Sequence, residues 1–524
     1  MSKYKCPRCG GNMKRDSRTP AGKRRWSCTP YVNGKRVYCY STTDPAAPER
    51  TQRGDTTARA ALPRQSLASQ RYVITWAQNA TPVHSEFLAC LQTFCKHNNA
   101  QLLVIPGRYK NPTSQWTASQ ANEEEWAPEI APYLIAQRRK LNDNISIVGD
   151  LKIQPTAVTP LTGFEGLTGA ESAVIGHPKL QLKTVATPSN KMAKLLTTTG
   201  AVTVRNYTDS RAGKGGDFHH YFGAALVEIV NSKVFHLHQL SYAPHAHGFI
   251  HRDLAYFAHG VKKAPPYKAL VFGDAHAQFA DAQVVAATFG KSGLVELLDP
   301  EVQVFHDLLD AYAVNPHHFG NPFTAIAKRQ CSFDDIKAEV EHTISKLVEW
   351  SAGRRSVVVA SNHDNMLARW IMNSDWRRDP VNAAFYLETA LHMVKSVTMT
   401  KHGASYIDPF QFHVEALVPK SANIACLGRD QSFVVGGIEL SLHGDQGPKG
   451  ARGSVKNLSR IGTRLMTGHG HSPAIEEGHW RVGTMTPVKL EYTGPVGDWL
   501  QTHGSIDAFN KRHLHTCIEG SFYL

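Results

Sequence analysis

Five polar clusters in the second half of the chain contain the residue types that bind divalent metal ions. Each cluster follows an apolar, strand-like run: ALVFG, VQVF, VVVAS, IELSL or RLMTG. The carboxyl ends of neighbouring strands meet at one edge of an open α/β sheet, so we expect the clusters to converge there. The clusters contain Asp274 and His276; His306, Asp307 and Asp310; Asn362, His363 and Asp364; His443 and Asp445; and His469 and His471.

The residue types in these clusters point to metal chemistry. A carboxylate and an imidazole two residues apart, as in Asp274-Ala275-His276, can face one ion from a strand end. D-x-H or H-x-H alone arises by chance in a chain with 27 histidines, but five clusters in this order form a strong signal. Oxygen and nitrogen ligands without thiolates suit manganese, iron or zinc better than magnesium. We therefore expect divalent ions, with manganese first and iron, zinc or magnesium as the alternatives.

The order of the clusters resembles the calcineurin-like metallophosphoesterase superfamily, whose pattern is D-x-H, G-D-x-x-D, G-N-H-[DE], a lone His and G-H-x-H. The match runs from Asp274 to His471. His306 and Ser361 stand where the family has glycine, so we expect altered local turns at these positions. The resemblance implies an α/β fold, with a two-sheet metallophosphoesterase sandwich flanked by helices (α-β-β-α).

The resemblance also implies a binuclear centre and a role for each cluster. Two ions about 3.5–4 Å apart would clamp a phosphate and lower the pKa of a water, with Asp307 bridging them. His363 would protonate the leaving oxygen without binding metal, and Asp364 would orient its imidazole. Asp310 is interpreted as structural or as a support for the ligands. The first ion would be held by Asp274, His276 and His471, and the second by Asn362, His443 and His469.

Positive charge is concentrated at the N-terminus. Residues 1–54 hold 13 Lys or Arg and 3 Asp or Glu, which accounts for most of the formal net charge of +14. A basic segment attached to a nearly neutral body suggests a polyanion-binding attachment. On charge alone, a solvated tail is the alternative.

Four cysteines in residues 1–42 predict a structural zinc ribbon that resembles those of transposases and other DNA-associated proteins. Cys6 and Cys9 form a CxxC turn, and Cys28 and Cys39 would complete a tetrahedral site. A redox CxxC or unliganded cysteines are the alternatives. The cationic loop between the cysteines suits phosphate contacts and stacking on an unpaired base, through Lys14, Arg15, Arg18, Lys23, Arg24, Arg25 and Trp26.

The rest of the chain predicts an α/β organisation. RYVITWA, HSEFLACLQTFCKHNN and QLLVIPG predict strand, helix and strand, and GAVTVRNY, ALVEIVNSKVFHLHQL and VKLEYTG predict further strands. The pairs His236/His238 and His245/His247 have no carboxylate at a familiar spacing and are interpreted as structural or substrate-facing. The expected domains are 1–42 (zinc ribbon), 43–70 (flexible linker), 71–265 (α/β accessory domain), 266–485 (catalytic domain) and 486–524 (C-terminal extension).

Membrane and secretory classes are excluded at the level of sequence. No apolar run approaches the roughly 18–20 residues of a membrane span, and MSKYKCPRCGG lacks the apolar core of a secretory signal. Nine cysteines, five of them scattered, do not indicate a disulfide framework. We expect a soluble cytoplasmic protein without a membrane partner, and homo-oligomerisation stays open.

The N-terminal segment indicates the substrate. The catalytic core of this superfamily does not, because it acts on phosphomonoesters, cyclic nucleotides and nucleic acids alike. A cationic zinc ribbon ahead of a phosphodiesterase centre favours DNA. The combination resembles the double-strand-break repair nucleases in its core and the DNA-degradation nucleases of T5-like bacteriophages, which destroy host DNA, in its build. We expect a two-metal DNA nuclease, located in the host cytoplasm if phage-encoded. The alternatives are a phosphatase or phosphodiesterase for a small molecule or protein, with the ribbon used for recruitment, and a binding protein with a degenerate site.

Overall fold

The computed structural model describes the body of the chain and part of its N-terminal segment. Described are residues 70–109, 125–188, 192–318, 320–401, 403–490 and 494–523, and the backbone of five short strands between residues 14 and 42. Contacts divide the chain into two compact units, Met1–Pro63 and Arg64–Leu524. In the first unit, one antiparallel sheet contains β1 (Lys14–Arg18), β2 (Arg24–Cys28) and β5 (Tyr40–Thr42), and β3 (Tyr31–Val32) pairs with β4 (Lys35–Arg36).

Several predictions for the first unit fall outside the described residues. These are the zinc ligands Cys6, Cys9 and Cys39, the cation Lys23, and residues 43–69 of the linker. Cys28 and the cationic residues of β1 and β2 are described by their backbone only. The zinc ribbon and its DNA contacts therefore stay predictions.

The second unit opens with the predicted strand, helix and strand. The two strands pair in parallel, the helix crosses over between them, and an antiparallel hairpin completes a four-stranded sheet. The elements are β6 (Arg71–Gln78), α1 (Ser85–His97), β7 (Ala100–Gly107), β14 (Gly223–Ile229) and β15 (Phe235–Ser241), in the sheet order β15-β14-β6-β7.

Alternate side chains of β6 point to opposite faces of this sheet, and the two faces pack against different neighbours. Tyr72, Ile74 and Trp76 face a central core that contains residues of all three large sheets. Val73 and Ala77 face the other way and pack with α1. This helix–sheet arrangement, together with the two sheets below, confirms the predicted α/β class.

A ten-stranded mixed sheet runs through the second unit. Strands from residues 138–198 pair in it with strands from residues 434–481, so the sheet is continuous across the domain boundary predicted at residue 266. In sheet order the strands are β25 (Val434–Val435), β26 (Ile438–Glu439), β27 (Arg464–Thr467), β29 (His479–Arg481), β28 (Ala474–Glu476), β11 (Gln181–Val185), β13 (Lys194–Thr198), β10 (Ser172–Ile175), β9 (Ile145–Val148) and β8 (Arg138–Asn142).

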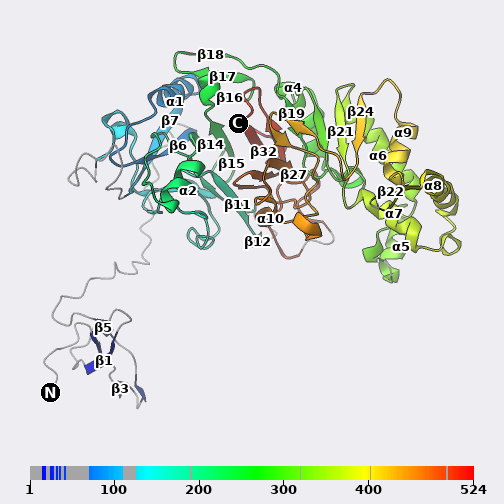
Figure 1. Cartoon of the computed structure of the whole chain (residues 1–524), viewed down its shortest axis with the longest axis horizontal. Coiled ribbons are helices and arrows are strands. Elements are labelled where there is room, and N and C mark those ends of the chain that lie inside the picture. Colours follow the sequence, from blue (N-terminus) through cyan, green and yellow to red (C-terminus); the bar gives the residue numbers. More distant parts are fainter. Residues whose placement is uncertain are drawn as a thin grey trace. The chain divides into compact units, whose positions relative to one another are not determined.

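A six-stranded sheet packs one face against the ten-stranded sheet and the other against helices. Val271 and Val304 join the central core, whereas Leu270 and Phe305 join the helices. In sheet order its strands are β24 (Ile424–Leu427), β21 (Ser356–Val359), β20 (Gln303–Phe305), β19 (Ala269–Val271), β31 (Thr502–Ile506) and β32 (Arg512–Thr516). The helices on its outer face, several of which gather beside β21 and β24 in Figure 1, include α3 (Ala282–Phe289), α4 (Leu294–Leu298), α6 (Ile336–Ser351), α7 (Asp364–Asn373), α8 (Ala383–Ser396) and α9 (Pro409–Leu417).

One strand prediction is wrong, and a second lies partly outside the described residues. GAVTVRNY forms single bridges only, because its backbone bonds to two different segments: Val202 N–H donates to Trp76 and Ala201 N–H to Tyr221. In VKLEYTG, the described residues 488–490 and 494 are not part of a strand, and residues 491–493 lie outside the described chain.

None of the described helices has the length and apolar character of a membrane span.

Smaller elements complete the second unit. The smaller elements are β12 (Thr187–Pro188) and β30 (Val496–Gly497), which pair; β16 (Gly248–His251), β17 (Leu254–Phe257) and β18 (Gly260–Lys263), which form a meander; the hairpin β22 (Thr398–Thr400) and β23 (Gly403–Ser405); and the helices α2 (Arg211–His219), α5 (Pro322–Gln330) and α10 (Val455–Leu458).

A buried histidine in β31 makes stability depend on pH. His503 Nδ1 accepts a hydrogen bond from Gly273 N–H at 3.0 Å, and its Nε2 lies 2.9 Å from Thr288 Oγ1. Burial lowers the pKa of His503 to about 3. Below about pH 6.5 the unfolded chain binds a proton that the folded chain excludes, so each pH unit costs about 1.4 kcal/mol of stability down to the folded pKa.

Replacing this histidine should remove its share of the acid sensitivity. In His503→Asn, we expect the free energy of unfolding to fall less steeply between pH 6.5 and pH 4.5, by about 1.4 kcal/mol per pH unit. Urea unfolding in EDTA at several pH values measures the slope. His342→Asn, at an exposed position on α6, is the control, and equal slopes in the two variants would contradict the prediction.

Candidate metal centre

Four side chains of types that can ligate metal ions meet where β19, β20 and β27 end. Asp274 and His276 follow β19, Asp307 follows β20, and His471 follows β27. One ligand atom of each lies within 4.8 Å of the others, and all four residues are buried. His471 Nε2 lies 3.0 Å from Asp274 Oδ2 and 3.3 Å from His276 Nε2. These four residues are termed the first group.

Asp307 also belongs to a second group, with His443, His469 and Asn362. The ligand atoms of Asp307, His443 and His469 lie within 4.8 Å of one another. His443 Nε2 lies 3.1 Å from Asp307 Oδ2 and 3.0 Å from Asn362 Oδ1. His469 Nδ1 lies 2.9 Å from the same amide oxygen. The structure thus brings all seven predicted ligand residues together, in the two predicted sets, with Asp307 common to both.

The spacing of these atoms fits divalent ions. Two ligand atoms at right angles, each about 2.1 Å from an ion, lie about 3 Å apart. Within the groups, neighbouring ligand atoms lie 2.9–3.3 Å apart, except that His276 Nε2 lies 3.9 Å from Asp307 Oδ2. The buried His/Asp cluster can therefore hold metal ions, and its oxygen and nitrogen donors are those that manganese, iron and zinc accept.

The ligands turn into the site because the backbone becomes left-handed directly after the strands. His276, Asp307, His469 and His471 have φ values between 39° and 69°. This conformation costs about 1–2 kcal/mol per non-glycine residue, so the surrounding packing must hold it. Gly468 permits the close approach, since a Cβ at this position would lie 2.2 Å from Asp274 Oδ1.

The carboxylates make the site strongly negative, and protonated histidines offset that charge. Burial lowers the pKa of His276, but the hydrogen bond to Asp310 and the charges of Asp307 and Asp274 outweigh it and raise the pKa to about 9. Burial is likewise outweighed at His443, whose pKa the Asp307 carboxylate raises to about 9. The imidazoles thus carry the positive charge that metal ions would supply, and ion binding has to release these protons.

Asp310 holds two imidazoles. Its carboxylate accepts a hydrogen bond from His276 Nδ1 at 2.8 Å, which leaves Nε2 to face the first group. Its backbone carbonyl accepts one from His363 Nδ1 at 3.0 Å. The three residues also lie close enough to hold an ion, but these hydrogen bonds already use both Nδ1 atoms. Asp310 therefore fixes the tautomer and orientation of each ring, in agreement with its interpretation as a support for the ligands.

Asp364 does not occupy the place predicted for it. In the described chain the partner of the His363 ring is Asp310, while Asp364 Oδ1 accepts a hydrogen bond from Leu309 N–H at 3.2 Å. Burial, helped by the charge of Asp307, raises the pKa of Asp364 to about 7. Asp364 therefore holds the loop after β20 instead of the imidazole.

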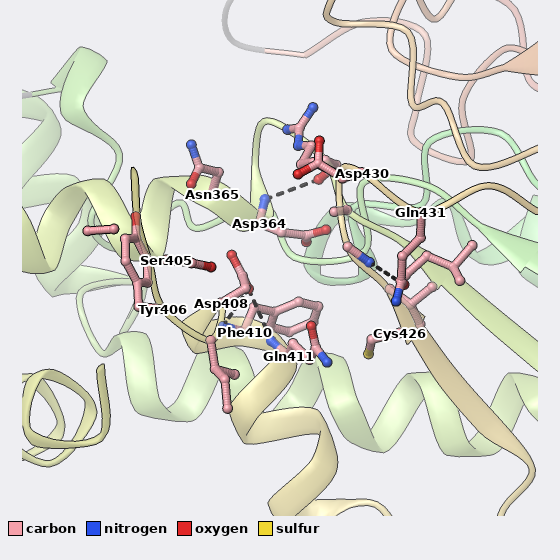
Figure 2. Close-up of a pocket in the computed structure, with 18 residues that line it drawn as sticks. Asp364, Asn365, Ser405, Tyr406, Asp408, Phe410, Gln411, Cys426, Asp430 and Gln431 are labelled. Carbon is pink, nitrogen blue, oxygen red and sulfur yellow. Dashed lines mark hydrogen bonds between the residues drawn. The ribbon is translucent and has the colours of Figure 1, made fainter. Parts of the chain in front are cut away.

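Asp364 also lines a pocket of about 500 Å³ beside the metal centre, shown in Figure 2. Asp408 lines the same pocket and caps α9, accepting hydrogen bonds from Phe410 N–H at 2.9 Å and Gln411 N–H at 3.1 Å. Burial raises the pKa of Asp408 and that of the Cys426 thiol, the latter to about 12. These groups are therefore more readily neutral than exposed ones.

The two residues that replace the family's glycines are accommodated differently. The His306 ring is fully buried 5.6 Å from the ring of His443, and neither of its nitrogens has a hydrogen-bond partner in the described chain. Ser361 Oγ accepts a hydrogen bond from Asp364 N–H at 3.1 Å and so supports the start of α7.

The histidine pairs of the predicted accessory domain lie outside both groups. His236 and His238 are buried in β15, where His238 Nε2 lies 3.1 Å from the Glu228 carboxylate. His247 Nδ1 lies 3.1 Å from the Glu86 carboxylate. The contact of the buried His238 agrees with a structural role for that residue, and the choice between structural and substrate-facing roles stays open for the other three.

No protein-family model matches the chain. The chain is 27% identical to protein A1 of Escherichia phage T5 over 465 residues, which cover 87% of this chain and 83% of protein A1. The similarity extends over most of both proteins and supports the expected likeness to a T5-like phage protein.

Replacing the shared carboxylate should weaken both groups at once. In Asp307→Asn we expect less than half of the wild-type manganese to remain after dialysis, because each group loses a charged ligand. Elemental analysis of the purified protein measures the content. Asp299→Asn, which changes an exposed carboxylate paired with Arg354, is the matched control. Wild-type metal content in Asp307→Asn would make Asp310 the next candidate for the shared ligand.

Proposed function

We propose that this protein is a two-metal-dependent phosphodiesterase that acts on DNA, built on the metallophosphoesterase sandwich. The observation that carries the proposal is the pair of ligand groups joined at Asp307. The calcineurin-like superfamily pattern implies the same seven positions in the same two sets. The face-to-face packing of the six- and ten-stranded sheets, with helices outside, supports the α-β-β-α architecture.

Divalent ions in the two groups would stabilise the charge that develops on a phosphoryl group and lower the pKa of a water. Manganese is the first expectation, with iron, zinc or magnesium as alternatives. The residues that would hold one ion are Asp274, His276 and His471, and those that would hold the other are Asn362, His443 and His469, with Asp307 between them.

His363 is suited to protonate the leaving oxygen. Its Nδ1 donates to the Asp310 carbonyl, so the other ring nitrogen, Nε2, stays available to a substrate. The His363 side chain is 19% exposed, in contrast to the buried residues of the first group. Its ring stands edge-on to His276, with 4.7 Å between the ring centres, which keeps it beside the first group.

The proposed substrate rests on the N-terminal segment and on the phage relative. Residues 1–54 contain 13 basic and 3 acidic side chains, and this excess of positive charge supports a polyanionic substrate. A zinc ribbon formed by the four cysteines would present these cations to DNA. The likeness to a phage T5 protein supports a role in phage infection, where the enzyme would degrade host DNA in the host cytoplasm.

Cleavage assays distinguish this function from a phosphatase and test the role of His363. With manganese the protein should degrade linear or circular DNA, and EDTA should abolish degradation. His363→Ala should keep its metal ions and its DNA affinity, yet lose roughly 100–10,000-fold in single-turnover rate. His342→Ala, at the exposed position on α6, should match the wild type.

Two outcomes would count against these assignments. Parallel loss of metal and activity in His363→Ala would make His363 a ligand. Rapid hydrolysis of p-nitrophenyl phosphate without action on DNA would favour a phosphatase that uses its ribbon for recruitment.

DNA affinity should depend strongly on salt. For duplex DNA, the logarithm of the affinity should fall with the logarithm of the salt concentration by about 0.9 per phosphate contact. Deleting residues 1–54 should flatten this slope, measured by binding titrations in EDTA at several salt concentrations. An unchanged slope would put the main phosphate contacts on the second unit.

A further inference from the structure

A cavity of about 650 Å³ lies at the opposite end of the strands that carry metal ligands. Arg464 lines this cavity and begins β27, whereas His469 and His471 follow the other end of that strand. A strand of four residues spans about 13 Å, so the cavity and the metal centre are separate sites. Its walls come from the segment after α2, the starts of β27 and β29, and the residues before β32.

Positive charge dominates the lining of this cavity, which is termed the basic cleft. Glu477 is the carboxylate among its lining residues, and it lies 3.1 Å from Lys179 and 3.8 Å from His219. Lys179 also pairs with Glu476 at 3.5 Å, so the excess positive charge of the lining comes from the other cations. The cations that line the cleft are Lys179, Arg205, Arg464, Lys511 and Arg512.

Aromatic rings and carbonyls, not carboxylates, hold two of these cations. Arg512 donates hydrogen bonds to two backbone carbonyls and lies 4.8 Å from the centre of the Trp480 ring. Lys511 Nζ lies 5.7 Å from the centre of the Tyr221 ring. Burial lowers the pKa of both groups, that of Arg512 to about 9. The Asp507 carboxylate offsets part of this effect at Lys511, whereas the neighbouring Arg464 lowers both pKa values further. Asp507 thus compensates the Lys511 charge only in part, and a bound anion would stabilise both cations further.

An exposed aromatic side chain stands at the same cleft. Phe218, near the end of α2, lines it and is 81% exposed. Arg205 lies over the ring of Phe222, 5.8 Å from its centre, and both line the cleft. Cations beside an exposed ring are the combination that binds unpaired nucleotides, through phosphate contacts and base stacking.

We propose that the basic cleft binds the phosphate backbone of a single-stranded stretch of DNA, with Phe218 stacking on an unpaired base. The inference rests on the proposed function, because it gives the DNA substrate a second contact site away from the metal centre. A polymer can engage both sites, whereas a small phosphodiester reaches the metal centre alone. The cleft also gives a role to the predicted accessory domain, which supplies Phe218 and Arg205.

The test compares two double variants of the full chain. Arg464→Ala/Lys511→Ala should bind a fluorescent 30-nucleotide single strand in EDTA at least tenfold more weakly than the wild type. Its salt slope should be smaller by about 1.4, since single strands contribute about 0.7 per phosphate contact. Lys96→Ala/Lys291→Ala removes the same charge at exposed positions outside the cleft, and its affinity should change by less than twofold.

Two further measurements separate a binding role from a loss of folding. Phe218→Ala changes an exposed side chain and should weaken single-strand binding about fivefold or more, with little effect on duplex binding. All these variants should hydrolyse bis(p-nitrophenyl) phosphate with manganese at the wild-type rate.

Three results would be decisive. Equal oligonucleotide affinity in the cleft variant and the control variant would overturn the inference. So would direct binding of dAMP that depends on Arg464 and Lys511 while oligonucleotide affinity stays unchanged, since the cleft would then take a free nucleotide. A protein that binds the oligonucleotide through the cleft but cleaves no DNA would refute the proposed function and leave the inference standing.

Discussion

Asp274, Asp307 and Asp310 bring three buried carboxyl groups close together. Charges of one sign repel strongly in such surroundings unless cations or hydrogen-bond donors compensate them. Here His276 and His443 become the compensating cations, with pKa values of about 9. The rest of the architecture maintains this arrangement. β19 and β20 are parallel neighbours, so their ends deliver the carboxylates to one place, and left-handed residues then turn them inward.

The buried His/Asp cluster could be predicted from sequence because each of its parts is local. An apolar run of three or four residues marks a strand, and the polar residues directly after it mark the end of that strand. The parallel order of β19, β20 and β21 then brings Asp274, Asp307 and Asn362 together without any knowledge of the loops. For the same reason, sequence spacing was enough to group the residues within a cluster. His469 and His471, two positions apart, both have a left-handed backbone and lie on one tight turn.

Contacts between distant segments could not be predicted in this way. Asp364 follows His363 in sequence, yet its carboxylate meets Leu309, because α7 begins at Asp364 and carries it away from the ring. GAVTVRNY has the alternation of a strand, but two different neighbours take its hydrogen bonds. The basic cleft combines residues 179, 205, 464 and 511, and no pattern in the sequence connects positions so far apart.

The ten-stranded sheet joins residues on both sides of position 266 through the pairing of β11 with β28. A chain cut there would leave each fragment with an open strand edge, whose unpaired amides and carbonyls invite aggregation. The half with the metal ligands is therefore not a cassette that recombination could transfer to another protein by itself. If both fragments were produced together, the open edges of β11 and β28 could pair with each other again. A split version of the protein could therefore reassemble through this one strand pairing.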